Sequence, residues 1–172
     1  MPGGRSRGDN PLDGALRIRD CRTGDAPALR RVFESSIHTL AARDYRPDQL
    51  AAWAPREHDA ALWAERIQRI QPFVAELDNT IAGFADVQPS GYIELFFVSG
   101  DHAGRGVATA LMAHLQAVAQ ARGITALHAN VSLRAERFFL ASGFAIEMRQ
   151  EVERAGVILR NARMRKVLTA AA

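Results

Sequence analysis

The chain has only one cysteine, Cys21, among its 172 residues. A single thiol cannot form an internal disulfide, so the sequence excludes a disulfide-stapled domain and favours a reducing compartment. At this length a hydrophobic core supports one domain without such a staple. We therefore expect a single domain over residues 15–168, between an N-terminal tail (residues 1–14) and a C-terminal tail (residues 169–172).

Long hydrophobic runs are also missing. No stretch approaches the ~20 apolar residues that a membrane-spanning helix needs. Residues 1–14 are polar, rich in Gly, Pro and Arg, and lack the apolar core of a signal peptide. These absences predict a cytoplasmic protein with no membrane partner.

Lysine is nearly absent as well. Lys166 is the only lysine among 22 Lys and Arg residues, and the formal net charge is +3. A charge this small does not indicate a nucleic-acid partner. The local excess of arginine between Arg149 and Lys166 indicates either a solvated strand face or a patch that attracts an anion such as a phosphorylated cofactor. The five histidines have no ligand-like spacing with Cys21 or with one another, so no metal is expected.

Hydrophobic periodicity predicts a mixed α/β chain with its strands grouped in the middle and at the end. The segment 92–98 has the strongest strand signal because it is aromatic and β-branched. The predicted strands are 16–21, 73–77, 81–87, 92–98, 125–131, 144–152 and 157–164. The predicted helices are one that ends near residue 42, two short segments before residue 71, a long helix from Val107 to a C-cap glycine at Gly123, and 133–141.

The most informative segment is the loop between strand 92–98 and the long helix. Its glycines, Gly104 and Gly106, let the backbone approach a ligand closely, and the first N–H groups of a helix have no internal partners. Such a loop is either an anion site for a phosphate or pyrophosphate, or a plain connection. Two common phosphate-binding loops do not fit. The Walker loop needs the sequence Gly-Lys-Ser/Thr, but the only lysine, Lys166, follows Arg165. The Rossmann fingerprint needs a third glycine at the position of Thr109.

Three segments in order, Ile93–Val98, Ala103–Ala108 and Ala135–Phe144, make the chain resemble the GNAT superfamily of acyl-CoA-dependent N-acyltransferases. The resemblance covers residues 16–166, and the insert around residues 44–54 is similar to a subgroup of small, mostly uncharacterised bacterial members. It implies a central mixed, mostly antiparallel sheet of about seven strands with helices on both faces. It also implies direct transfer of an acetyl group from acetyl-CoA to a small-molecule or peptide amine in a ternary complex. Many relatives pair through their C-terminal strands, which leaves a homodimer open.

The resemblance also implies where coenzyme A binds. The loop would cradle the pyrophosphate. Gly106 and Ala108 fit the family pattern Gln/Arg-x-x-Gly-x-Gly/Ala, and Ala103 departs from its first position. The backbone near Val98 would pair with the pantetheine arm, and an N–H there would polarise the thioester carbonyl. Asn130 and Ser132 either hydrogen-bond the pantetheine or the substrate, or are ordinary polar residues of a surface turn. The expected cofactor residues are Phe96, Phe97, Val98, Ala103, Gly104, Arg105, Gly106, Val107, Ala108, Thr109, Asn130, Ser132 and Phe138.

An amine must lose a proton to attack a thioester, and a carboxylate can accept it. Glu94 lies where family members often place such a base, although it could instead face solvent or pair with an arginine. Phe139 stands where the family often has a tyrosine acid, but a thiol with a pKa of ~8.5 leaves without much protonation. Tyr45 is the second catalytic candidate because its loop could reach the site.

The insert supplies the acceptor candidates. His38 and Trp53 could line an acceptor pocket, while Trp53 could instead plug the insert onto the core. No Gly-x-Ser-x-Gly elbow is present, so covalent catalysis is not expected. The departures at Ala103 and Phe139 leave a second function open, a non-catalytic acyl-CoA-binding sensor or interaction module. A nucleotide-binding protein on an unrelated α/β fold is a third.

Overall fold

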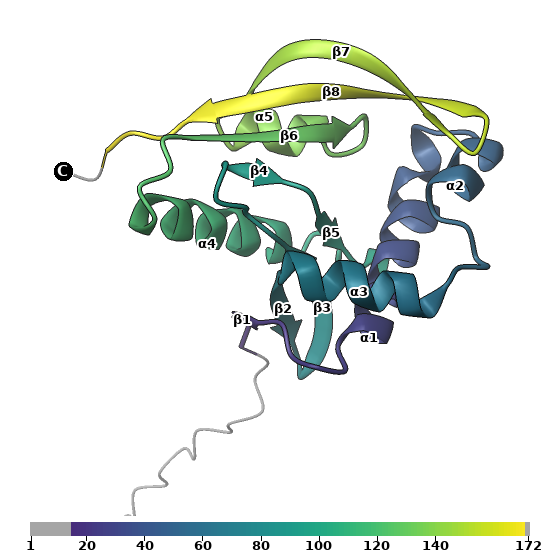
Figure 1. Cartoon of the computed structure of the whole chain (residues 1–172), viewed down its shortest axis with the longest axis horizontal. Coiled ribbons are helices and arrows are strands. Elements are labelled where there is room, and N and C mark those ends of the chain that lie inside the picture. The colour runs from purple at the N-terminus through teal and green to yellow at the C-terminus, as the bar shows by residue number, and fades with distance from the viewer. Residues whose placement is uncertain (1–14, 171–172) are drawn as a thin grey trace, which may run out of the picture.

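A computed structural model describes residues 15–170 of the chain, so the predicted N-terminal tail and the last two residues lie outside the described residues. The strands form two four-stranded sheets that lie one above the other in Figure 1. The first sheet contains, in spatial order, β1 (Arg17–Asp20), β2 (Phe73–Leu77), β3 (Thr80–Ala85) and β5 (Phe96–Val98). The second contains β4 (Tyr92–Ile93), β6 (Ala126–Ser132), β8 (Val157–Val167) and β7 (Ala145–Arg154).

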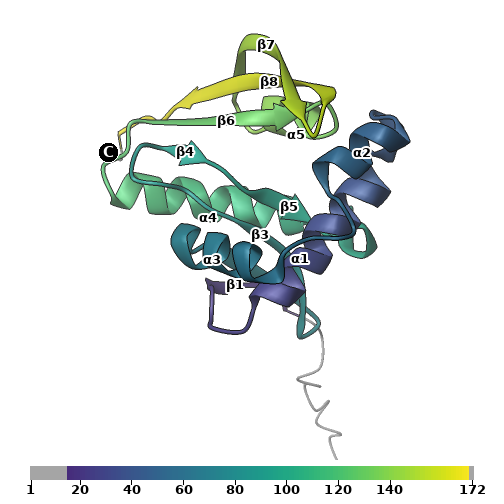
Figure 2. The same cartoon turned by 45° about the vertical axis from the view of Figure 1, so that its right-hand side comes forward.

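The fold class predicted from the sequence is confirmed. Every strand pair is antiparallel except β4 with β6, which is parallel. The strand count differs from the expected seven because the predicted strand 92–98 divides. Its first part, β4, joins the second sheet, its last part, β5, joins the first sheet, and Glu94 and Leu95 lie between them. Figure 2 shows β4 and β5 running between the two layers.

Helices cover both faces of the first sheet. They are α1 (Ala26–Ser35) and α3 (Ala60–Ile70) on one face and α4 (Val107–Ala121) on the other. The two remaining helices, α2 (Pro47–Trp53) and α5 (Glu136–Ala141), contact strands of the second sheet. Because side chains alternate along a strand, the neighbours Val74 and Ala75 of β2 enter different hydrophobic clusters. Val74 packs with residues of α1 and α3, and Ala75 packs with residues of α4. The expectation of helices on both faces is therefore correct.

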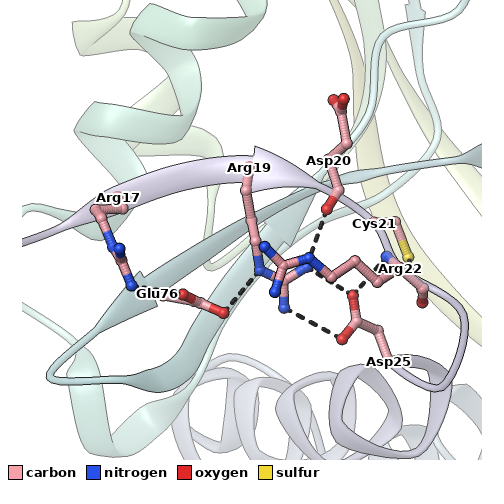
Figure 3. A network of polar contacts seen from close by, with 7 residues as sticks. All are labelled: Arg17, Arg19, Asp20, Cys21, Arg22, Asp25 and Glu76. Carbon is pink, nitrogen blue, oxygen red and sulfur yellow. Dashed lines mark hydrogen bonds and ion pairs between the residues drawn. The ribbon is translucent and has the colours of Figure 1, made fainter.

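A polar network fastens β1 to β2 and to the start of α1 (Figure 3). The guanidinium of Arg19 donates to Glu76 Oε1 at 2.7 Å and to Asp25 Oδ2 at 2.8 Å. Cys21 lies beside this network, and burial raises the pKa of its thiol to about 11. Thiolate is therefore scarce at neutral pH, which makes Cys21 a poor nucleophile.

Candidate active site

The glycine loop leads into the N-terminus of α4, and its two glycines have positive φ angles. Gly104 and Gly106 have φ of +75° and +82°, values that favour glycine, and no atom lies within 4 Å of where a Cβ would stand on either. Gly106 is the residue before the first turn of α4, so the unpaired N–H groups of that turn open onto unfilled space. This arrangement favours an anion at the loop.

A cavity of about 580 Å³ lies against this loop and is called the larger cavity below. It gathers most of the predicted cofactor residues: Val98, Ala103, Gly104, Gly106, Val107, Ala108, Thr109 and Phe138. Arg105 is not among its lining residues, because its guanidinium pairs with Asp78 at 3.0 Å. Arg134 and Arg137 do line it, and neither has an ion pair among residues 15–170.

Strand β5 presents a free backbone edge next to the cavity. Leu95 accepts a hydrogen bond from the Asp86 N–H, and the Ser99 N–H donates to Ala82, so residues 95, 97 and 99 turn their backbone groups toward β3. By alternation, the N–H and C=O groups of Phe96 and Val98 point away from β3. No other strand of the described chain pairs with this edge, so an extended ligand can add to it as a strand would.

A second cavity, of about 180 Å³, lies on the other side of the divided strand and is called the smaller cavity below. It brings together Tyr45, Trp53, Glu94, Phe97, Asn130 and Ser132 from the predicted site. His38 lines neither cavity, because its Nε2 is 2.7 Å from the backbone oxygen of Ala54 and is used in holding the segment after α2.

Glu94 both lines the smaller cavity and pairs with arginine. Its Oε2 accepts from Arg66 Nε at 3.1 Å and lies 3.5 Å from the Arg69 guanidinium, both on α3. The side chain is 19% exposed, and its Oε1 has no hydrogen bond or ion pair within residues 15–170. The two arginines thus orient the carboxylate while one oxygen stays available.

Tyr45 joins the helical insert to the second sheet. Its hydroxyl donates to the Arg160 carbonyl at 2.5 Å and accepts from the Leu133 N–H at 2.9 Å. Burial raises the pKa of Tyr45, so its phenol keeps its proton. Trp53 packs edge-on against this ring with 5.4 Å between centroids. Trp53 therefore both lines the smaller cavity and packs the insert onto the core.

The remaining predicted residues are held by neighbours. Asn130 Oδ1 accepts from Gln150 at 2.9 Å, and Ser132 Oγ accepts from the Ala135 N–H at 3.2 Å. Phe96 packs against Phe138, with 5.6 Å between ring centroids. Asn130 and Ser132 lie on β6, at the boundary of the smaller cavity.

Asp86 is the residue that divides the strand, a role that was not predicted from the sequence. Its side chain is 2% exposed, and its Oδ1 accepts from both the Leu95 N–H at 2.6 Å and the Glu94 N–H at 3.0 Å. The carboxylate thus binds backbone groups that a continuous strand would use in a ladder. Burial raises its pKa to about 6.

The raised pKa of Asp86 makes stability depend on pH. Between about pH 4 and pH 6 the folded protein keeps a proton on Asp86 that the unfolded chain has released. The contribution of Asp86 to the free energy of unfolding therefore falls as the pH rises through this range, and it is constant above it. The shift corresponds to roughly 3 kcal/mol. We expect the free energy of unfolding of wild type to fall by about this amount between pH 4 and pH 7 relative to Asp86→Asn. Chemical denaturation across that range measures it, and parallel pH profiles would refute it.

Comparison with known proteins decides the family. A family model described as the acetyltransferase (GNAT) domain matches residues 41–168. The chain belongs to the GNAT acetyltransferase family. It is 31% identical over 150 residues to the uncharacterized N-acetyltransferase YafP of Escherichia coli K12, and the match covers 87% of this chain and 95% of YafP.

Solved structures agree with this assignment. A GCN5-related N-acetyltransferase from Rhodopseudomonas palustris superposes with a TM-score of 0.85 at 31% identity, over 93% of this chain and all of that chain. YncA of Salmonella typhimurium, solved with its cofactor acetyl-CoA, shares the fold at a TM-score of 0.68 and 19% identity, with 92% of this chain and 96% of YncA covered.

This GNAT protein is an N-acetyltransferase, which moves the acetyl group of acetyl-CoA to an amine. The family assignment excludes the alternative of a nucleotide-binding protein on an unrelated fold. No group of three or more His, Cys, Asp or Glu side chains in residues 15–170 is placed to hold a metal ion. Among the same residues, no helix has both the length and the apolar character to cross a membrane.

Proposed function

We propose that the donor acetyl-CoA occupies the larger cavity and the free edge of β5, and that an amine in the smaller cavity attacks the thioester directly. One observation carries this proposal: β5 connects the two cavities, because Val98 lines the larger and Phe97 lines the smaller. A ligand that adds to β5 from the glycine loop therefore ends beside Glu94. Donor and acceptor then meet in one ternary complex.

The loop and two arginines supply the charge for the pyrophosphate. The N–H groups at the start of α4 and the open space at Gly104 and Gly106 suit two closely bound phosphate groups. Arg134 and Arg137 add positive charge from the other wall of the larger cavity. They compensate for Ala103, where the family pattern has a basic or amide side chain.

The backbone of β5 is proposed to stabilise the transition state electrostatically. The N–H groups of Phe96 and Val98 point to the free edge and are placed to donate to the thioester carbonyl, where negative charge develops during attack. These donors belong to a strand held by β3 on its other side, so they need no reorganisation. Phe138 packs on Phe96 beside this edge.

Glu94 is the proposed base. Its Oε2 is held by Arg66 and Arg69, which leaves Oε1 to take a proton from the acceptor directly or through water. Tyr45 is assigned to positioning rather than to proton transfer, since its hydroxyl already donates to the Arg160 carbonyl and accepts from the Leu133 N–H. Phe139 is 2% exposed and carries no acid, so the thiolate leaves without a side-chain acid at that position.

Three further expectations belong to this proposal. We propose that the enzyme is cytoplasmic, as the sequence predicts. Homodimerisation through the C-terminal strands stays a prediction. The acceptor is an amine of a small molecule or a peptide.

The double variant Arg134→Gln/Arg137→Gln tests the charge in the larger cavity. We expect its Kd for acetyl-CoA to rise about tenfold or more, and to depend less on salt, because two phosphate contacts are lost. Arg31→Gln, an exposed arginine of α1, is the control and should bind as wild type does. Equal affinity of the double variant and wild type would remove these arginines from the donor site.

Calorimetric titration tests the donor site as a whole. We expect micromolar binding of acetyl-CoA to the purified protein, with none of ATP or NAD. Incubation with acetyl-CoA alone should leave the intact mass of the protein unchanged, because no acetyl-enzyme forms in a direct transfer. An acetylated protein that passes the group to an amine would contradict the direct mechanism.

A further inference from the structure

The charged side chains around the smaller cavity are not balanced. Its lining includes Arg66, Arg154 and Arg160 but only one acidic residue, Glu94. Arg66 is paired with Glu94, and Arg160 donates to Glu151 at 3.1 Å. Arg154, the last residue of β7, has no ion pair among residues 15–170. The cavity therefore has a cation without a partner.

The same cavity has an acceptor atom without a donor. Asn161 lies opposite Ser132 in the β6–β8 ladder, and its Oδ1 is buried with no hydrogen-bond partner in the described structure. A buried amide oxygen without a donor is unfavourable, and most such atoms in proteins are paired. A protonated primary amine has three N–H donors, and it could give one to Asn161 Oδ1 and one to the free Oε1 of Glu94.

The rest of the lining limits the size of the acceptor. Phe33, Trp53, Phe97 and Leu159 form an apolar wall. The volume of about 180 Å³ equals roughly six water molecules at ~30 Å³ each. A compact body with an apolar portion suits this space better than a bulky or highly polar one.

We infer that the acceptor is a small primary amine that also carries a carboxylate. The amine nitrogen lies between Asn161 Oδ1 and Glu94, and the carboxylate pairs with Arg154, whose planar guanidinium can donate two parallel hydrogen bonds. This inference rests on the proposed role of the smaller cavity as the acceptor site. The protonated amine first gives one proton to Glu94 and attacks as the neutral amine. The reaction then forms the amide N–C bond and breaks the C–S bond, and the second N–H proton passes through water to the departing thiolate, so that coenzyme A leaves as the thiol.

The experiment compares kcat/KM for pairs of acceptors that differ only by a carboxylate: phenylalanine with 2-phenylethylamine, and γ-aminobutyrate with propylamine. We expect wild type to prefer the carboxylated member by at least about tenfold in one pair or both, since a charged hydrogen-bonded contact is worth this much. Arg154→Gln should lower kcat/KM for the preferred carboxylated amine about tenfold and change its partner less than twofold. The matched control is Arg163→Gln, because Arg163 is an exposed arginine of β8 that lines neither cavity. This variant should keep the wild-type ratio of kcat/KM between the carboxylated amine and its partner.

A binding measurement separates this inference from the proposed function. The preferred carboxylated amine is titrated into wild type and Arg154→Gln, each saturated with coenzyme A, and only wild type should bind it tightly. Acetylation that favours the amines without carboxylates, or an Arg154→Gln variant with the wild-type ratio, overturns the inference and leaves the proposed function intact. Binding of acetyl-CoA without acetylation of any amine in a broad panel overturns both.

Discussion

Gly106→Asp should raise the Kd for acetyl-CoA at least 100-fold. The new carboxylate would stand at the start of α4, where it would repel a pyrophosphate and satisfy the N–H groups that the pyrophosphate needs. Gly106 has φ of +82°, so any side chain there is also strained. Because no atom lies within 4 Å of the Cβ position, the variant should fold. Calorimetry with acetyl-CoA measures the loss.

Two controls separate charge from strain in that experiment. Gly106→Asn has nearly the same shape and tolerates a positive φ, so it should lose much less affinity than the aspartate variant. Gly156→Asp places the same residue at the β7–β8 turn, at φ +76° and in open space, and reports the cost of backbone strain away from the loop. Wild-type affinity in Gly106→Asp would show that the loop is only a connection.

Glu94→Gln should lower kcat about 100- to 1000-fold and leave the Kd for acetyl-CoA within about twofold. The amide keeps the size of the side chain and can still accept from Arg66, but it cannot take a proton from the amine, and general bases contribute 10²–10⁴ to rates. The donor affinity is spared because Glu94 lines only the smaller of the two cavities. Initial rates at saturating acetyl-CoA, with Kd from calorimetry, give both numbers.

Glu151→Gln is the matched control for that variant. Glu151 also pairs with an arginine, Arg160, but it lies outside both cavities and is 56% exposed. Its loss should change kcat less than twofold. Full activity of Glu94→Gln would remove Glu94 as the base, and an equal loss in both variants would indicate that broken ion pairs, rather than proton transfer, lower the rate.

Local signals predicted the elements well, because each depends on residues close together in the sequence. Gly123 ends α4 with φ of +71°, as predicted. Ala155 and Gly156 turn the chain between β7 and β8, in the gap between the predicted strands 144–152 and 157–164. The division of strand 92–98 was not predictable in this way. It depends on the carboxylate of Asp86, which precedes Glu94 and Leu95 by eight and nine positions and reaches their N–H groups only in the folded chain.

In the candidate site, too, only the features that depend on neighbouring residues could be predicted from the sequence. Backbone features of the larger cavity followed from the order of glycines and small residues in one loop. The direction of a long side chain did not, since Arg105 turns to Asp78, while Arg134 and Arg137 line the cavity from the segment at α5. The signal that could have identified Arg134 and Arg137 was their position just before Phe138, a residue that was already expected at the cofactor site.

Contacts between distant segments also decide the smaller cavity. Arg66 and Arg69 reach Glu94 from α3. A pairing of Glu94 with an arginine was one of the expected alternatives, but its partners lie too far away in the sequence to be named from it. His38 was expected near the acceptor, but the carbonyl of Ala54 holds its ring nitrogen. Asn161 was not singled out, and Arg154 was considered only as part of the arginine-rich segment from Arg149 to Lys166, because nothing near them in the sequence shows that β8 and β7 border the cavity.

A crystal structure of the protein with acetyl-CoA tests the central claim most directly, which is that β5 carries the donor from the glycine loop to the cavity beside Glu94. We predict the pyrophosphate on the N–H groups from Gly104 to Ala108, the pantetheine paired with the backbone of Phe96 and Val98, and the acetyl group at the opening of the smaller cavity. A donor bound with its acetyl group elsewhere, or with no contact to the free edge of β5, would contradict the account.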